Sequence, residues 1–129
     1  SANPLQFAAM RATLSEVMTA ANYSHMEAGA ARLASGLAGA IQRHGAPWHV
    51  VRVGARVEFI CQETPLRNGS ESYTAHKPAL EQALHSALVN RGCLIAPFHN
   101  MMLVSPATTD AQIDRLVAAF DAITAEMMA

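Results

Sequence analysis

The sequence predicts an α+β fold in which helices pack on one face of a small antiparallel or mixed sheet. One further helix is predicted at the N-terminus. Three observations lead to this prediction. Apolar residues recur at helical spacing in four segments, a valine-rich stretch reads WHVVRVGARVEFICQ, and a helical segment separates two pairs of short apolar runs. At 129 residues, the chain is long enough to form a domain with its own core.

The first helix is predicted over residues 4–18. Asn3 and Gln6 have the spacing of a capping box, and Pro4 occupies the first helical position, where a backbone N–H would have no partner. Apolar residues fall on two faces of this helix. Such a distribution is typical of a helix that is buried on more than one side.

A second helix is predicted to begin at Ser24, after a break over residues 19–23, because Glu27 follows at the capping-box spacing. The helix is expected to end before Gly45, since glycine favours helix C-termini. Its apolar stripe is formed by Met26, Ala30, Leu33, Leu37 and Ile41.

The valine-rich stretch predicts two strands, at about 48–53 and 56–61, which a tight turn at Gly54 joins. Residues 63–76 are rich in turn-forming and hydroxyl side chains, so they are predicted to form a polar loop. Long loops in compact domains are often functional or mobile.

The third helix is predicted to begin at Pro78, a proline at its first position, with Gly92 as its C-terminal signal. Short strands are expected at 93–96 and 101–104, on either side of the connection PFHN. The last helix is predicted to follow Thr109, with Gln112 at the capping-box position. Its apolar stripe is formed by Ile113, Leu116, Val117, Phe120 and Ile123.

Composition and charge argue against two kinds of partner. A net charge of −1 offers no basic surface for nucleic acid, and 5% aromatic residues are few for base stacking. No apolar run approaches the roughly 20 residues that a membrane span requires. We therefore expect neither a nucleic-acid nor a membrane partner.

The apolar content of 51%, against 15% charged residues, is high for a small domain. It indicates either a surface that a partner covers or simply an alanine-rich sequence. Cys61 and Cys93 are isolated in apolar runs, so they are predicted to be buried, reduced thiols. We also find no secretory signal, and a cytoplasmic protein is expected.

Few residues are arranged for chemistry. The six histidines lack the short spacings of zinc ligands, so no metal site is predicted, and neither a nucleophile elbow nor a phosphate loop is present. PFHN is the informative stretch, because it places Phe98, His99 and Asn100 on a turn between two strands, where a sheet can present side chains to a ligand. The alternative is an ordinary hairpin in which Asn100 serves the turn.

Three motifs follow one another along the chain, namely SANPLQFAAMRATL, VGARVEF and RGCLIAPFHNMMLVSPATTDAQID. In order and spacing they resemble the C-terminal part of class III pyridoxal-phosphate-dependent aminotransferases of fold type I. The similarity is closest to the glutamate-1-semialdehyde 2,1-aminomutase-like branch. The motifs are similar to the family's S-x-N-P-x-x-x-A-A helix, its V-G-S-M-F strand pair, and its closing run of R-G-V-x-x-x-P, V-S and T-x-x-D-I-D. The resemblance spans essentially the whole chain.

The resemblance implies that residues 1–22 are a linking helix from a missing N-terminal large domain. Residues 23–129 would then be the C-terminal small domain of a fold type I enzyme, and Ser1 would be an internal position of a longer chain. A homodimer and a small-molecule amino substrate are implied as partners.

The resemblance further implies pyridoxal 5'-phosphate as the cofactor of the full-length protein, held by a lysine upstream of Ser1. Lys77 is the only lysine in the sequence and matches a surface loop of the family. We therefore expect no catalytic, cofactor-binding or metal-binding residue in this chain, no covalently bound cofactor, and no activity of the chain alone.

Many family members grip the substrate carboxylate with an arginine in the closing segment. Here Phe98, His99 and Asn100 occupy that neighbourhood, and Arg91 lies earlier, at a helix end. The resemblance thus implies that these three residues bind the substrate. The implied substrate is an amine, a β-amino acid, or a compound whose carboxylate the large domain holds.

The overall expectation is part of an enzyme that transfers an amino group between an amino compound and an oxo acid or aldehyde, either as an aminotransferase or as an aminomutase. The alternative is a stand-alone α+β module, derived from that domain, which binds a ligand or another protein.

Overall fold

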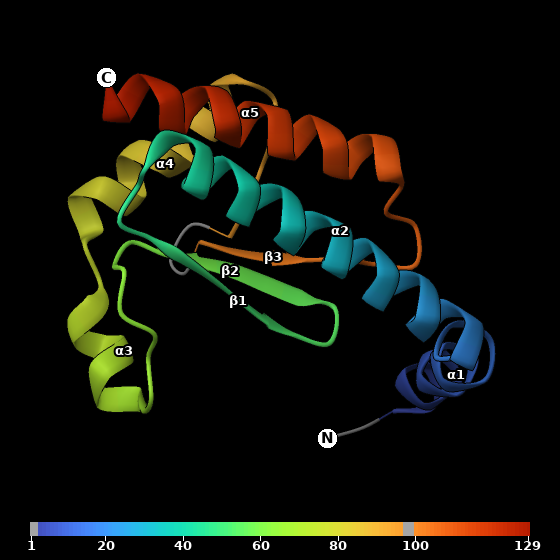
Figure 1. Cartoon of the computed structure of the whole chain (residues 1–129). Coiled ribbons are helices and arrows are strands. Elements are labelled where there is room, and N and C mark those ends of the chain that lie inside the picture. Colours follow the sequence, from blue (N-terminus) through green and yellow to red (C-terminus); the bar gives the residue numbers. More distant parts are fainter. Residues whose placement is uncertain (1–2, 97–99) are drawn as a thin grey trace.

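The computed structural model describes residues 3–96 and 100–129 of the chain. The π-helix η1 directly continues α1, and the remaining helices are α-helices. Along the chain (Figure 1), the elements are α1 (Pro4–Ala12), η1 (Thr13–Val17), α2 (Ala20–His44), β1 (His49–Val53), β2 (Arg56–Ile60), α3 (Gly69–Ala75), α4 (Pro78–Asn90), β3 (Met101–Leu103) and α5 (Asp110–Met128). The predicted α+β class is confirmed.

The strands form one antiparallel sheet in the order β1-β2-β3, which decides between the two predicted kinds of sheet. The first two strands lie as predicted, and Gly54 between them has a φ of 56°, which glycine adopts without strain. The strand predicted at 93–96 is wrong. This segment is irregular, and Ala96 donates its N–H to the carbonyl of Met101 at 3.2 Å without extending the ladder.

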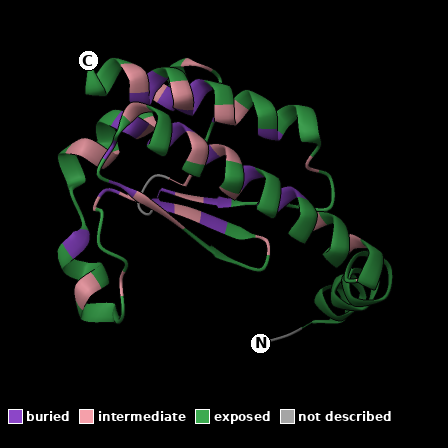
Figure 2. Ribbon diagram, in the orientation of Figure 1, coloured by how far each residue is buried: buried purple, intermediate pink, exposed green. Residues whose placement is uncertain are grey.

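Helices cover one face of the sheet, as predicted. Figure 1 shows α2 and α5 side by side above the strands, and Figure 2 shows buried residues along the surfaces where these layers meet. Val57 and Phe59 of β2 are fully buried on that face. The Phe59 ring centroid lies 4.9 Å from that of Phe120 on α5 and 6.5 Å from that of Trp48.

The two central helices approach each other closely. A Cβ atom at Gly36 of α2 would lie 2.6 Å from the side chain of Val117 on α5, so only glycine fits without a shift. On the exposed rim of this contact, Arg32 donates to both carboxylate oxygens of Asp114 at 2.7 Å. These hydrogen bonds and the guanidinium charge hold the pKa of Asp114 below its usual value.

The first helix begins as predicted, with a reciprocal capping box between Asn3 and Gln6. Helical backbone continues through η1, close to the predicted end at residue 18. No residue of α1 or η1 is buried, and large apolar side chains are exposed at Leu5, Phe7, Met10, Leu14, Val17 and Met18.

The second helix begins earlier than predicted, so the predicted start at Ser24 is wrong. Thr19 is the N-cap, and its hydroxyl accepts the N–H of Asn22 at 3.2 Å. The side chain of Asn22 also donates to the carbonyl of Val17 at 2.7 Å and closes the break between the two helices. Gly45 ends α2 with a φ of 65°, as expected.

The polar loop predicted at 63–76 is also wrong in part, because it contains α3. Asn68 caps this helix by accepting the N–H of Glu71 at 3.0 Å, and Ala75 at its end is buried. The two later helices begin at the predicted residues. Thr109 and Gln112 form the predicted capping box of α5.

Candidate functional site

The predicted substrate-binding turn is described in part. Phe98 and His99 lie outside the described residues, whereas Asn100 lies directly before β3. Asn100 is only 5% exposed and has a φ of 46°, the left-handed conformation that asparagine tolerates better than most residues. This backbone conformation gives Asn100 a role in the turn itself, and its contact with a substrate stays a prediction.

Asn100 lines a small cleft of about 20 Å³. The cleft brings together β2, the segment before α3, the middle and end of α3, and the start of α4. Its polar lining consists of Glu58, Ser72, His76, Glu81 and Asn100, and apolar atoms come from Phe59, Ile60, Leu66 and Ala75. A volume of this size holds about one water molecule, so the cleft alone is too small for a substrate.

Both carboxylates of the cleft have partners within the chain. Arg56 donates to Glu58 at 2.9 Å along the same strand. Glu81 accepts the backbone N–H of Lys77 at 3.0 Å, and its other oxygen lies 3.3 Å from Nδ1 of His76. These contacts fix the start of α4 next to the cleft.

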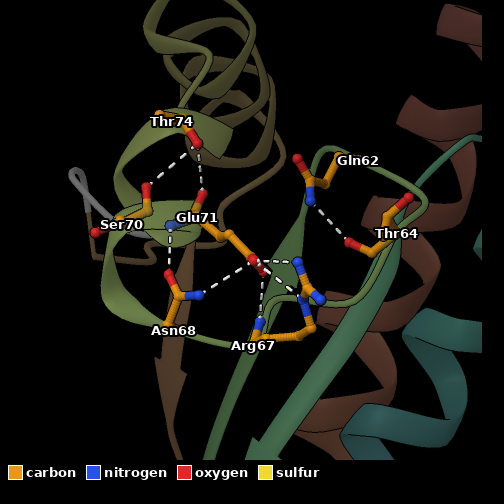
Figure 3. Close-up of polar contacts among 7 residues, drawn as sticks. All are labelled: Gln62, Thr64, Arg67, Asn68, Ser70, Glu71 and Thr74. Carbon is orange, nitrogen blue, oxygen red and sulfur yellow. Dashed lines mark hydrogen bonds and ion pairs between the residues drawn. The ribbon is translucent and has the colours of Figure 1, made fainter.

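The helix α3 forms one wall of the cleft and is held by a local network (Figure 3). Arg67 donates its backbone N–H and its guanidinium to Glu71, and the Asn68 side chain donates to the same carboxylate. The hydrogen bonds from Arg67 hold the pKa of Glu71 below its usual value. The spacing of Asn68 and Glu71 is the sequence signal that could have predicted this helix.

Cys61 directly follows β2 and is buried, as predicted, and so is Cys93; both are free thiols. Burial raises the pKa of the Cys61 thiol to about 12, and the negative charge of Glu81 adds to this effect. Near neutral pH this thiol is therefore protonated and is a poor nucleophile.

A larger cavity of about 530 Å³ lies elsewhere, between the segment 92–96, β3 and α5. Apolar side chains such as Ile95, Met102 and Ile113 line most of it, and Arg115 lies among the lining residues. Asn100, the one predicted substrate-binding residue that the structure describes, is not in this lining. Ala96 and Met101, which flank the turn, do belong to it.

Within residues 3–96 and 100–129, neither the one lysine nor Arg91 is placed to hold pyridoxal phosphate or to grip a substrate in the cleft. Lys77 is exposed at the start of α4 and not in a closed pocket. Arg91, the alternative carboxylate clamp, donates from one guanidinium nitrogen to both oxygens of Glu126, at 2.7 and 2.9 Å. It is thus engaged with α5 and does not line the cleft.

Residues 3–96 and 100–129 contain neither a metal-binding cluster nor a helix that could cross a membrane. No three His, Cys, Asp or Glu side chains in these ranges are grouped so that they could hold a metal ion. Within the same part of the chain, no helix combines the length and apolar character needed to cross a membrane.

Curated relatives of this chain are glutamate-1-semialdehyde 2,1-aminomutases. The enzyme of Desulfosudis oleivorans is 34% identical over 128 residues, which are 98% of this chain and 30% of the relative. An aminomutase of Brevibacillus brevis is 37% identical over 120 residues, which are 92% of this chain and 28% of the relative. No family model matches the chain.

The solved structures that superimpose on this chain include an aminomutase of the same kind and an aminotransferase. The glutamate-1-semialdehyde aminomutase of Pseudomonas aeruginosa superimposes with a TM-score of 0.93 and 41% identity, over 98% of this chain and 28% of that enzyme. A lysine-to-alanine variant of that aminomutase, in complex with PMP, gives a TM-score of 0.90 and 43% identity over 93% of this chain and 26% of that one. A β-phenylalanine aminotransferase from Variovorax paradoxus superimposes with a TM-score of 0.74 and 27% identity, over 92% of this chain and 27% of that enzyme.

The fold is therefore that of the C-terminal small domain of fold type I pyridoxal-phosphate enzymes. Within this class, the chain corresponds to the C-terminal part of a class III enzyme of the glutamate-1-semialdehyde 2,1-aminomutase branch. The chain spans about 30% of the length of the curated relatives that it matches.

Proposed function

We propose that this chain serves as the C-terminal domain of a pyridoxal-phosphate-dependent aminomutase or aminotransferase, which moves an amino group between an amino compound and an oxo acid or aldehyde. The observation that carries the proposal is the superposition on the Pseudomonas aeruginosa aminomutase, at 41% identity over 98% of the chain. The cofactor, when bound, would supply the electron sink for this chemistry.

The chain alone is proposed to be inactive. Its only lysine, Lys77, is exposed and lines neither of the two cavities described above. The lysine and the phosphate contacts would then come from the part of the enzyme that has no counterpart in this chain.

The part of the chain proposed to contact the substrate is the turn of Phe98, His99 and Asn100. Arg91 is less suited, because it is already paired with Glu126. An unperturbed histidine is mostly neutral at pH 7 and cannot replace an arginine as a permanent carboxylate partner. The proposed substrate is therefore an amine, a β-amino acid, or an aminomutase substrate whose carboxylate binds to the other domain. The similarity to a β-phenylalanine aminotransferase supports the second of these.

The proposal also includes a homodimer in the cytoplasm. The exposed apolar side chains of α1 provide a surface for dimer contacts. Two buried free thiols agree with a reducing compartment.

A chimera tests this function. The matching segment of the Pseudomonas aeruginosa aminomutase is replaced by this chain, and the chimera is compared with the chain alone. We expect the chimera to retain the absorbance of bound pyridoxal phosphate and to transfer amino groups, whereas the chain alone does neither. A chain that alone binds the cofactor stoichiometrically, with loss of binding in Lys77→Ala, would contradict the proposal. A chimera that folds but binds no cofactor would favour the stand-alone module.

The same chimera tests the turn. Phe98→Ala and His99→Ala are each expected to change the ratio of the specificity constants of two substrates by roughly ten- to two-hundred-fold, the usual effect of one lost substrate contact. Both variants should leave the cofactor absorbance unchanged. Arg91→Ala is the comparison variant. If only Arg91→Ala alters the substrate profile, the turn is not the substrate contact.

A further inference from the structure

The start of α3 contains the dipeptide Asn68–Gly69, and Asn68 is the only asparagine in the sequence that a glycine follows. An asparagine side chain loses its amide group when the next backbone nitrogen attacks the side-chain carbonyl carbon. Glycine in the next position favours this attack, because it has no side chain to hinder the approach and its backbone rotates freely. Both residues are exposed, and a Cβ atom at Gly69 would meet no atom within 4 Å. The surroundings of the dipeptide therefore leave room for the reaction.

The attacking atom would be the backbone nitrogen of Gly69. Gly69 is the first residue of α3, and the first N–H groups of an α-helix have no partner within the helix. The helix has only seven residues, of which Ala75 alone is buried. A segment with so little buried surface opens locally at a much lower cost in free energy than the core does. The conformation that the reaction needs is therefore accessible without global unfolding.

The folded structure nevertheless restrains the Asn68 side chain (Figure 3). Its Oδ1 accepts the N–H of Glu71 at 3.0 Å, and its Nδ2 donates to the Glu71 carboxylate at 3.1 Å. The Arg67 guanidinium donates to the same carboxylate at 2.7 and 3.0 Å. Asn68 has an extended backbone with a ψ of 170°. Attack by the Gly69 nitrogen requires rotation about the Cα–C bond of Asn68, which moves Glu71 away from the asparagine side chain and breaks these hydrogen bonds.

We propose that Asn68–Gly69 is a site of spontaneous deamidation whose rate is set by the hydrogen bonds of Asn68 and Arg67 to Glu71. The Gly69 nitrogen gives up its proton to solvent and forms a bond to Cγ of Asn68. The bond from Cγ to Nδ2 then breaks, and Nδ2 takes up a proton and leaves as ammonia. Water opens the resulting succinimide ring at one of its two carbonyl groups and leaves aspartate or isoaspartate at position 68. Water is the only co-reactant, so the step needs no enzyme, metal or oxidant.

The two products differ in their effect on the candidate cleft. Aspartate still caps a helix, but it lacks the amide donor and places a second negative charge beside Glu71. Isoaspartate continues the main chain through the former side chain. The backbone carbonyl of Asn68, which accepts the N–H of Ser72 at 3.1 Å, then becomes a free carboxylate beside the chain. Because Ser72 and Ala75 line the cleft, isoaspartate is expected to loosen this wall next to Asn100.

Peptide mass spectrometry tests the site. The purified chain is incubated at mildly alkaline pH, and conversion is measured as the mass gain from amide to acid, with isoaspartate detected by an isoaspartyl methyltransferase. We expect conversion at Asn68 at least ten-fold faster than at Asn90, which is also exposed but precedes Arg91. Gly69→Ala is expected to slow conversion at Asn68 at least ten-fold, and the open space at Gly69 accommodates the added methyl group.

Two comparisons test the restraint. Arg67→Ala removes the guanidinium that holds Glu71, so conversion at Asn68 is expected to rise several-fold, and the chain unfolded in urea should convert faster still. Tyr73→Ser is the matched control, since Tyr73 is 80% exposed on the same helix and serine has a similar helix propensity. Its rate should equal that of the wild type.

Three results would count against the proposal. Equal conversion at Asn68 and Asn90 would overturn the site. So would an absence of conversion at Asn68 in the folded wild-type chain over a time in which the unfolded chain converts completely. An unchanged rate in Arg67→Ala, or the same rate in the folded and the unfolded chain, would overturn the control by Glu71.

Discussion

Asn100 combines a left-handed backbone, with a φ of 46°, and a nearly complete burial of its side chain. An alanine at this position would have to adopt the same backbone, at a cost of about 1–2 kcal/mol, which glycine avoids. We therefore expect Asn100→Ala to lower the free energy of unfolding by about 1–2 kcal/mol more than Asn100→Gly does. Urea denaturation of the two variants measures this difference, and identical midpoints would contradict the left-handed conformation.

Because of Cys61, the free energy of unfolding is expected to depend on pH in the alkaline range. In the unfolded chain the thiol ionises near its ordinary pKa of 9.0, but in the folded protein burial raises the pKa to about 12. Between these values the unfolded state loses a proton that the folded state keeps, so the free energy of unfolding falls as pH rises. Below pH 9 the effect is absent.

We expect the urea midpoint to fall more steeply between pH 9 and 12 in the wild-type chain than in Cys61→Ala. The comparison isolates this thiol, since all other titrating groups are shared. Parallel curves for wild type and Cys61→Ala would show that Cys61 ionises at its ordinary pKa.

At the scale of elements, α2 offers a matched pair of glycines. A Cβ atom at Gly36 would meet Val117 at 2.6 Å, whereas one at Gly39 would have no atom within 4 Å. Gly39→Ala is expected to raise the free energy of unfolding by up to about 1 kcal/mol through helix propensity. Gly36→Ala is expected to lower it by about 1–3 kcal/mol through overpacking. Chemical denaturation distinguishes them, and a stabilising Gly36→Ala would mean that α2 and α5 are less closely packed.

Element prediction from the sequence succeeded where one signal dominated and failed where two competed. The capping boxes at Asn3 and Thr109 stand alone in their neighbourhoods, and both are confirmed. Near the start of α2, however, Thr19 and Ser24 are both residue types that cap helices, and only Ser24 has the Glu of a capping box three positions later. The structure nevertheless uses Thr19, and Asn22 then also binds the carbonyl of Val17.

The composition of the short helix α3 does not predict a helix. Glycine and serine at its first positions have low helix propensity and are typical of turns. The spacing of Asn68 and Glu71 is the one local signal for this helix, and the structure adds the donors that Arg67 and Asn68 direct to Glu71. Conversely, residues 93–96 have strand-like composition, but the described structure gives them no ladder partner.

At the scale of the whole molecule, the predicted turn and the cleft beside it differ in how far the sequence reveals them. The turn is one contiguous stretch, so its residues can be predicted together, and Asn100 lies where a turn residue is expected. The cleft assembles Glu58, His76 and Glu81 from separate segments. Their proximity depends on the path of the chain around α3, which local patterns do not contain.

The exposed apolar surface of α1 leads to a prediction about association. At high protein concentration the isolated chain is expected to self-associate through α1, because burial of this surface is favourable. A double change, Phe7→Ser with Leu14→Ser, should give a monomer in sedimentation velocity, while Tyr73→Ser on α3 should not. A monomeric wild-type chain whose α1 amides are well protected from hydrogen exchange would contradict this expectation.

The position of β1 at the edge of the sheet has a consequence for aggregation. Its outer backbone edge has no strand partner in the described sheet, and its sequence HVVRV is rich in residues that favour strand pairing. Arg52 is the only fully charged side chain within this strand. A charge in such a strand opposes the pairing of one edge with another, which is the way fibrils begin. We therefore expect Arg52 to act as a gatekeeper, which opposes pairing with other copies of the chain without contributing to the core.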